Sequence, residues 1–100
     1  MSNNSTPKFD VQGNIVPQQI DYAAHLATAL KEISTEVLRA KTLFPTNFHN
    51  QHEAYAVILE EFDELWDEIK KNHKHYDLVA QRTEAKQAAA MLVRLMVELL

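Results

Sequence analysis

The stretch that decides the fold reads ILEEFDELWDEI, from Ile58 to Ile69. Six of the nine positions from Glu60 to Glu68 are acidic, and apolar side chains are interleaved with them. At about 100° per residue, the apolar side chains gather on one broad face of a helix. That face comprises Tyr55, Ile58, Leu59, Phe62, Leu65, Trp66 and Ile69. The pattern predicts an amphipathic helix. Trp66 and Tyr55 could stack on a base, but their place on this face favours core packing.

The acidic side chains of this helix divide into two groups. The first group points away from the apolar face and is interpreted as solvated surface: Glu60, Asp63 and Asp67. The second group forms a single stripe, because its members are three and four residues apart: Glu61, Glu64 and Glu68. This stripe borders the apolar face. Its members are either solvated as well or, in part, converge on a metal ion, and Glu68 can belong to either set.

Glycine and proline divide the chain into an arm and a helical domain. Residues 1–18 contain the single glycine and two of the three prolines, so they are predicted to form a flexible arm. Residues 19–100 are predicted to form one all-α domain of three helices. The first should cover residues 20–42 and end before Pro45. The second should open with a capping box, Asn50 and Glu53, and continue through Lys71. After an NHKHY turn, the third should run from residue 76 or 77 to the C-terminus.

Composition narrows the function classes. The formal net charge is −4 and the sequence has no basic cluster, which argues against nucleic acid as a partner. The sequence has no cysteine, which excludes disulfides and thiolate chemistry and fits a reducing compartment. It also lacks a secretory signal pattern and any long uncharged apolar run. We therefore expect a soluble, cytoplasmic protein that does not bind membranes.

The third predicted helix is apolar on most of its circumference. From Ala88 to Leu100 only Arg94 and Glu98 are charged. Two neighbouring helices from the same chain would not cover such a helix on all sides. We therefore expect a homodimer or homotetramer, in which the helices pack into an oligomeric helical bundle.

A second acidic feature lies on this third helix. Glu84 shares an apolar stripe with Ala80 and Ala88, where an unpaired carboxylate is costly. If the second and third helices form an antiparallel hairpin about Lys74, then Glu64 is level with Glu84, and Glu61 is level with Gln87. Three carboxylates and an amide oxygen suit Mg²⁺ or Mn²⁺. A di-iron bundle would need Glu-x-x-His pairs, which the five histidines do not provide.

The segments HEAYAVILEEFDELWDEIK and RTEAKQAAAMLVR resemble the small MazG-like proteins of the all-α NTP pyrophosphatase superfamily, which include short forms from phages and prophages. That family carries Glu-x-x-Glu on one helix and Glu-x-x-Asp on the next. Glu61 and Glu64 match the first motif, and Glu84 matches the start of the second. Gln87 stands where the family has aspartate. The similarity covers roughly residues 45–97.

The resemblance implies a bundle that dimerises and binds Mg²⁺ against a nucleoside triphosphate. Water would attack the α-phosphorus, giving a nucleoside monophosphate and pyrophosphate. Glu61, Glu64 and Glu84 would be catalytic metal ligands, with Gln87 as a weaker fourth ligand. Cationic help for the phosphates would come from a set that the sequence does not narrow further: Lys70, Lys71, Lys86 and Arg94.

Because Gln87 stands where the family motif has aspartate, three interpretations remain open. The site binds metal more weakly, or it recruits Glu68 or Asp77 as a substitute ligand, or it has lost catalysis. The alternative function is therefore a non-catalytic helical interaction module that retains the MazG-like bundle.

Overall fold

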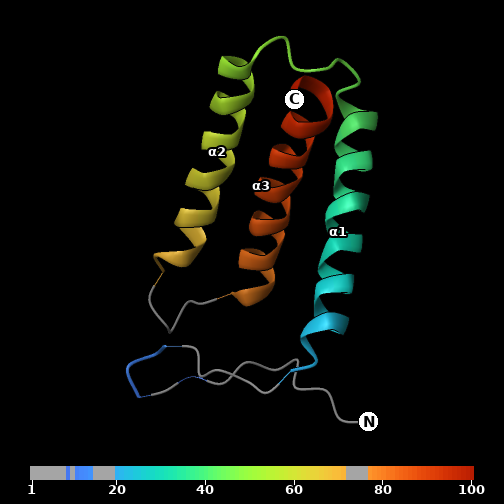
Figure 1. Cartoon of the computed structure of the whole chain (residues 1–100). Coiled ribbons are helices and arrows are strands. Elements are labelled where there is room, and N and C mark those ends of the chain that lie inside the picture. The colour runs from blue at the N-terminus through green and yellow to red at the C-terminus, as the bar shows by residue number, and fades with distance from the viewer. Residues whose placement is uncertain (1–8, 10, 15–19, 72–76) are drawn as a thin grey trace.

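A computed structural model of the chain describes Phe9 and residues 11–14, 20–71 and 77–100. Within these ranges the protein is all-α, as predicted, with three helices (Figure 1). They are α1 (Tyr22–Leu43), α2 (Gln51–Ile69) and α3 (Leu78–Leu99). Most of the predicted arm and the whole NHKHY turn lie outside the described residues. None of the described helices is both long and apolar enough to cross a membrane.

Each helix starts at a side-chain cap. The carboxylate or amide oxygen of Asp21, Asn50 and Asp77 accepts a hydrogen bond from the backbone N–H three residues later, at 3.1, 2.9 and 2.9 Å. At the other end of α1, Phe44 leaves helical geometry directly before Pro45, as the sequence predicts. The second helix is shorter than predicted, because it ends at Ile69 and not at Lys71.

The predicted capping box at the start of α2 forms only in part. Asn50 caps the N–H of Glu53 as expected. The Glu53 carboxylate, however, accepts from the N–H of His49 at 3.0 Å, one residue before the predicted donor. It also contacts Nδ1 of His49 at 2.8 Å. This contact raises the pKa of His49 and lowers that of Glu53, because it favours the charged form of both side chains.

The three helices form an open layer. Figure 1 shows α3 between the other two, with α1 parallel to it and α2 antiparallel to it. Within the described residues, α3 packs against both α1 and α2, whereas α1 and α2 do not pack against each other. The layer is therefore not closed into a bundle by its own chain, and each outer helix keeps a face without a helical neighbour.

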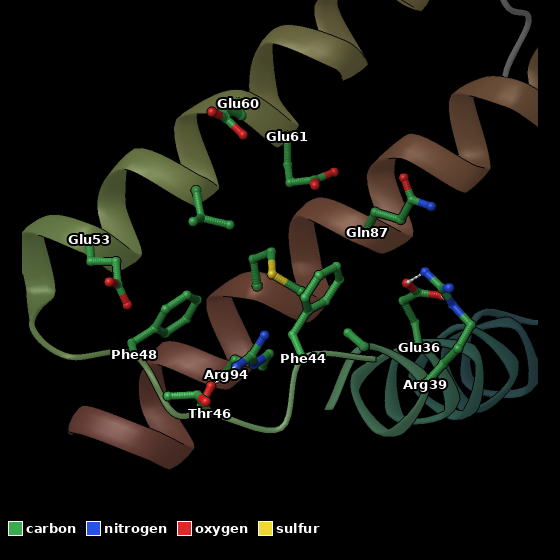
Figure 2. A pocket seen from close by; sticks show the side chains of 13 residues that line it. Glu36, Arg39, Phe44, Thr46, Phe48, Glu53, Glu60, Glu61, Gln87 and Arg94 are labelled. Carbon is green, nitrogen blue, oxygen red and sulfur yellow. Dashed lines mark hydrogen bonds and ion pairs between the residues drawn. The ribbon is translucent and has the colours of Figure 1, made fainter. Parts of the chain in front are cut away.

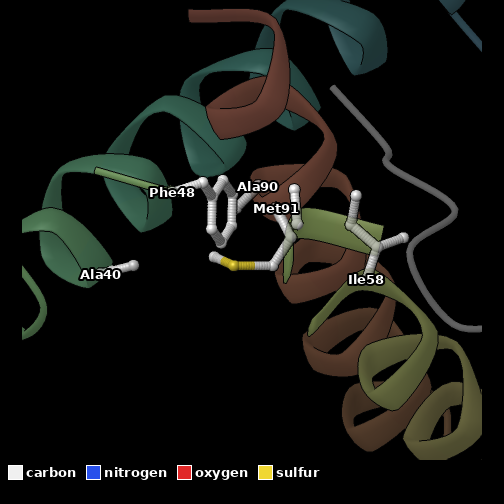
Figure 3. Packing of buried hydrophobic residues seen from close by; sticks show 6 residues of the cluster. Ala40, Phe48, Ile58, Ala90 and Met91 are labelled. Carbon is white, nitrogen blue, oxygen red and sulfur yellow. The ribbon is translucent and has the colours of Figure 1, made fainter. Parts of the chain in front are cut away.

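The hydrophobic core is small and lies where the α1–α2 loop meets α3. Its buried members are Ala40, Phe48, Ala54, Ile58, Ala90 and Met91. Figure 3 shows the Phe48 ring beside Met91, with Ile58 on the α2 side. Three of the six members are alanines, so the helices approach closely but bury little area each. No large side chain among the described residues is fully buried.

Most of the apolar face of α2 is exposed, which corrects the sequence-based prediction. Ile58 is buried, but the Tyr55 and Trp66 residues keep 64% and 58% of their surface accessible. Core packing of these two side chains within the chain is therefore wrong. The cause is the open layer: α1 lies on the far side of α3 and does not reach α2.

A buried ion pair connects α3 to the α1–α2 loop. Arg94 and Glu98, one turn apart, are only 6% and 5% exposed at their side chains, and Nε lies 2.7 Å from the carboxylate. Glu98 also accepts from the N–H of Phe48 at 2.8 Å, and Arg94 donates to the carbonyl of Thr46 at 3.2 Å. Lys41 of α1 lies 3.7 Å from Glu98. The two charges of α3 thus fix the loop on the end of the layer.

We expect Arg94→Ala to lower the free energy of unfolding by about 3–5 kcal/mol, because Glu98 would remain buried without its main partner. Urea unfolding at neutral pH measures this loss. The hydrogen bond from Arg94 is the largest of the effects that lower the pKa of Glu98. The stabilisation is therefore complete above the ordinary carboxylate pKa and is lost as the pH falls through the lowered one.

Arg82→Ala is the matched control for this prediction. Arg82 also makes a two-pronged contact, with Glu32 at 3.0 and 2.9 Å, but both partners are accessible to solvent. Its removal should cost far less stability than the removal of Arg94. Equal losses in the two variants would show that burial of the Arg94 pair contributes nothing.

Candidate acidic site between two helices

The antiparallel packing of α2 on α3 brings three carboxylates together. Glu61 and Glu64 lie one turn apart on α2, and Glu84 projects from α3. One carboxylate oxygen of each lies within 4.8 Å of the other two. The sequence-based register about the inter-helix turn placed these glutamates at one height, and the structure brings all three together.

Two of the three carboxylates are partly buried and incompletely paired. Glu61 and Glu84 are half-buried, whereas Glu64 is exposed. Within the described residues, Oε2 of Glu61 and Oε2 of Glu84 are buried and have no hydrogen-bond partner. A buried acceptor without a donor costs free energy. Two such oxygens in one cluster indicate a place where a cation or a proton is needed.

Burial and the closeness of the carboxylates to one another also raise the pKa of two of them. Burial raises the pKa of Glu61, and the nearby charges of Glu64 and Glu84 raise it further. Burial also raises the pKa of Glu84, with further contributions from the charge of Glu64, a hydrogen bond with it, and the charge of Glu68. Ionisation of each of these two carboxylates therefore costs more free energy in the folded chain than in the unfolded chain. A divalent cation bound beside them would favour the ionised form and so lower both pKa values.

A cavity of about 480 Å³ adjoins the cluster. Glu61 and Gln87 extend into it from α2 and α3, and Phe44 and Phe48 line it from the α1–α2 loop (Figure 2). Gln87 and Glu61, which the register argument placed level with each other, thus line the same cavity. The cavity combines aromatic walls, an acidic edge and an amide group, which suits a ligand with an apolar ring and a charged end.

Two functional candidates on α1 escaped the sequence analysis. Glu36 is 6% exposed and forms a two-pronged ion pair with Arg39, at 2.9 and 2.6 Å, at the wall of this cavity. The signal was available, because Glu36 follows Ile33 by three residues and therefore lies beside the apolar stripe of its helix. Figure 2 shows the pair below Gln87. Arg39 brings a cation to the cavity that the proposed list of cations lacks.

The predicted cations lie in three different surroundings. Lys71 is exposed and pairs with Glu68 at 2.9 Å. Lys86 is half-buried on α3, and its charge contributes to the lowered pKa of Glu32 and of Glu36 on α1. Arg94 borders the cavity but already donates to Glu98 and Thr46. Of this set, only Arg94 therefore lines the cavity, where Arg39 is a second cationic lining residue.

The two residues proposed as substitute ligands, Asp77 and Glu68, already have partners within the chain. Asp77 caps the first turn of α3 through the N–H of Ala80. Glu68 pairs with Lys71, yet its charge contributes to the raised pKa of Glu84. Of the two, Glu68 is thus the one that acts electrostatically on the cluster.

No protein-family model matches the chain, and no curated protein or solved structure is detectably similar to it. The MazG-like resemblance therefore rests on the sequence motifs alone.

In metal-free protein at neutral pH, we expect Glu84→Gln to raise the midpoint of thermal unfolding. The substitution removes a partly buried charge whose pKa is raised in the folded state. A raised carboxylate pKa destabilises the fold fully above the raised pKa and not at all below the ordinary one, so the gain should shrink as the pH falls through the raised pKa and vanish below the ordinary pKa. Differential scanning calorimetry with a chelator, at neutral and acidic pH, measures both effects.

Asp63→Asn is the control, since Asp63 is exposed and outside the cluster. It should leave the midpoint unchanged. A lower midpoint for Glu84→Gln at neutral pH would contradict the interpretation of Glu84 as an uncompensated charge.

Proposed function

We propose that the chain is a divalent-metal-dependent nucleoside triphosphate pyrophosphohydrolase of the cytoplasm. Water would add to the α-phosphorus, the bond to the β-phosphate oxygen would break, and the products would be a nucleoside monophosphate and pyrophosphate. The observation that carries the proposal is the convergence of Glu61, Glu64 and Glu84 within 4.8 Å, two of them with a buried unpaired oxygen.

The donor set fits a hard divalent cation. All three ligands are carboxylates, and hard oxygen ligands are those that Mg²⁺ and Mn²⁺ take. The unpaired oxygens of Glu61 and Glu84 are acceptors that such an ion would satisfy. Gln87, at the adjoining cavity, adds a neutral amide oxygen. The bound ion would supply charge compensation for the phosphates and for the transition state.

A triphosphate and an acidic cluster repel one another, so the pairing makes chemical sense only with cations between them. The protein's own groups would then position the reactants. Glu61 belongs to both the cluster and the cavity wall, so it is the carboxylate best placed to orient the attacking water. Phe44 and Phe48 offer apolar surface to the nucleoside.

The second candidate function is a non-catalytic helical interaction module. Two observations favour it: Gln87 replaces a carboxylate of the family motif, and a large part of the apolar surface of α2 is exposed. This alternative predicts a folded protein that binds metal or a protein partner but releases no pyrophosphate.

We expect pyrophosphate release from at least one nucleoside triphosphate in the presence of Mg²⁺ or Mn²⁺. A panel of ribo- and deoxyribonucleotides should be tested with a coupled pyrophosphate assay. Glu64→Gln should lower the rate by roughly 100-fold or more, the scale on which a group that stabilises developing charge contributes. Glu64 is exposed, so this variant should fold normally.

Asp63→Asn is again the matched control and should keep the wild-type rate. Release that does not need a divalent cation, or that survives in Glu64→Gln, would overturn the site assignment. No release with any nucleotide from a protein that binds metal would favour the interaction module.

Metal binding also predicts a stability change. Mg²⁺ or Mn²⁺ should raise the thermal midpoint of the wild type beyond the effect of a monovalent salt at equal ionic strength, because the ion binds the folded cluster. The shift should disappear in Glu84→Gln. A shift of the same size in both proteins would place the ion elsewhere.

A further inference from the structure

A cleft of about 460 Å³ lies between α1 and α3, which are neighbours in the layer (Figure 1). We call it the α1–α3 cleft. Its cationic lining residues are Lys31 and Arg39 of α1 and Lys86 of α3. Lys31, Thr35 and Arg39 follow one another at intervals of four, so they share one side of α1 and line the cleft together with Lys86. The sequence shows no run of basic residues here, because the cations come together only when α1 packs on α3.

The two carboxylates of the cleft are each paired with an arginine. Glu36 accepts two hydrogen bonds from Arg39, at 2.9 and 2.6 Å. Glu32 accepts two from Arg82 of α3, at 3.0 and 2.9 Å. Each acidic side chain of the cleft thus has its own counter-charge.

The two lysines of the cleft have no such partner. Within the described residues, neither Lys31 nor Lys86 forms an ion pair. Lys86 is half-buried, and an unpaired charge loses more hydration there than on an exposed surface. The three cations of the cleft, together with Arg82, face two carboxylates, so an excess of two positive charges remains. The cleft is thus a cationic region in a chain whose net charge is −4.

Helix α3 separates this cleft from the acidic cluster. Glu84 and Lys86 are two residues apart, about 200° around the helix, so they lie on opposite sides of it. Glu84 meets the carboxylates of α2, whereas Lys86 lines the cleft with α1. The cleft and the cavity beside the cluster meet at the ion pair of Glu36 and Arg39, which lines both. The cleft is therefore a second place for a ligand, with a charge opposite to that of the first.

We propose that the α1–α3 cleft binds a phosphate-bearing anion of the pyrophosphate class, without a metal ion. The donors favour that chemistry. Arginine presents a planar fork that matches phosphate oxygens, and lysine binds phosphate as a compact charge. Two helices supply three cations, which suits an anion with several negative charges better than a single carboxylate. The exposed hydroxyl of Thr35 adds a further donor.

This proposal does not rest on the proposed enzymatic function. The cleft needs no divalent cation and contains none of the three clustered glutamates. If the chain also releases pyrophosphate, that product has the chemistry that the cleft binds. Anion binding and hydrolysis can nevertheless fail separately, because one is measured without metal and the other requires it.

Calorimetric titration of pyrophosphate into protein freed of divalent cations on a chelating resin tests the site. We expect saturable binding that weakens as sodium chloride is added, because salt screens the attraction. Lys86→Gln should weaken the binding by about 10-fold or more, the scale on which a hydrogen bond to a charged group contributes. Lys71→Gln is the matched control. It removes the same charge from an exposed residue of the chain that lies outside the cleft, and it should leave the affinity unchanged.

A nucleoside triphosphate and a nucleoside monophosphate, titrated in the same way, identify the source of the phosphate. Equal affinities for pyrophosphate and the triphosphate would assign the cleft to free phosphate chains. Much tighter binding of the triphosphate, still weakened by Lys86→Gln, would assign it to the phosphate tail of a nucleotide. Either result supports an anion site in the cleft.

The proposal is wrong if none of the three anions binds at millimolar concentration. It is also wrong if Lys86→Gln leaves the affinity unchanged, or if Lys71→Gln lowers it equally, because the anion would then bind elsewhere or respond only to net charge. Circular dichroism must show retained helix in both variants. If Lys86→Gln does not fold, Lys31→Gln removes the other unpaired charge from an exposed position. Backbone amide shifts of the wild type, largest at Lys31 and Lys86 on addition of pyrophosphate, locate the anion without any variant.

Discussion

The ion pair between Arg94 and Glu98 is the contact on which the rest of the arrangement depends. It holds the α1–α2 loop on the end of α3 through the N–H of Phe48 and the carbonyl of Thr46. The Arg94 guanidinium also lies 4.7 Å from the centre of the Phe48 ring, within the range of a cation–π contact. Among the described residues, Phe48 is the only aromatic member of the core, and it also lines the cavity. The same buried charges thus stabilise the core and shape the cavity.

Two kinds of partly buried carboxylate coexist in this small protein, and the contrast between them identifies the acidic site. Glu98 and Glu36 each face an arginine, whose hydrogen bonds lower the carboxylate pKa. Glu61 and Glu84 face each other and Glu64, and their pKa is raised. Glu98 and Glu36 thus have their hydrogen-bond donors within the fold. The buried oxygens of Glu61 and Glu84 have no such partner among the described residues, which is the physical basis for proposing a cation there.

The sequence predicted the parts of this structure that are set by local rules. Asn50 and Pro45 fix helix ends through hydrogen bonding and backbone sterics, as predicted, whereas the caps at Asp21 and Asp77 were not predicted. The convergence of the glutamates followed from the antiparallel hairpin, because a short connection makes positions equidistant from the turn level with one another.

The placement of α1 could not be predicted in the same way. It runs parallel to α3, and a whole helix separates the two in the sequence, so no register argument relates them. That is why Glu36 and Arg39 were missed, and why Tyr55 and Trp66 were assigned to a core that α1 does not complete. The stripe of α2 was recognised as apolar, but sequence alone does not say whether the same chain or another covers it.

On the proposed function, Gln87 in place of the aspartate of the resembled motif would change the charge at the site more than its shape. Glu36, beside the same cavity, is paired with Arg39, yet its charge still helps to raise the pKa of Glu61, as the charge of Glu68 helps to raise that of Glu84. Mg²⁺ is usually held by one or two carboxylates together with water and substrate phosphates, and does not require a complete protein cage. On the proposed function, three carboxylates would therefore be enough to hold an ion whose remaining positions a triphosphate fills. An amide in place of a fourth carboxylate would weaken the affinity for metal alone more than the affinity for the metal–nucleotide complex. The nucleotide would then carry much of the metal affinity that the side chains no longer provide.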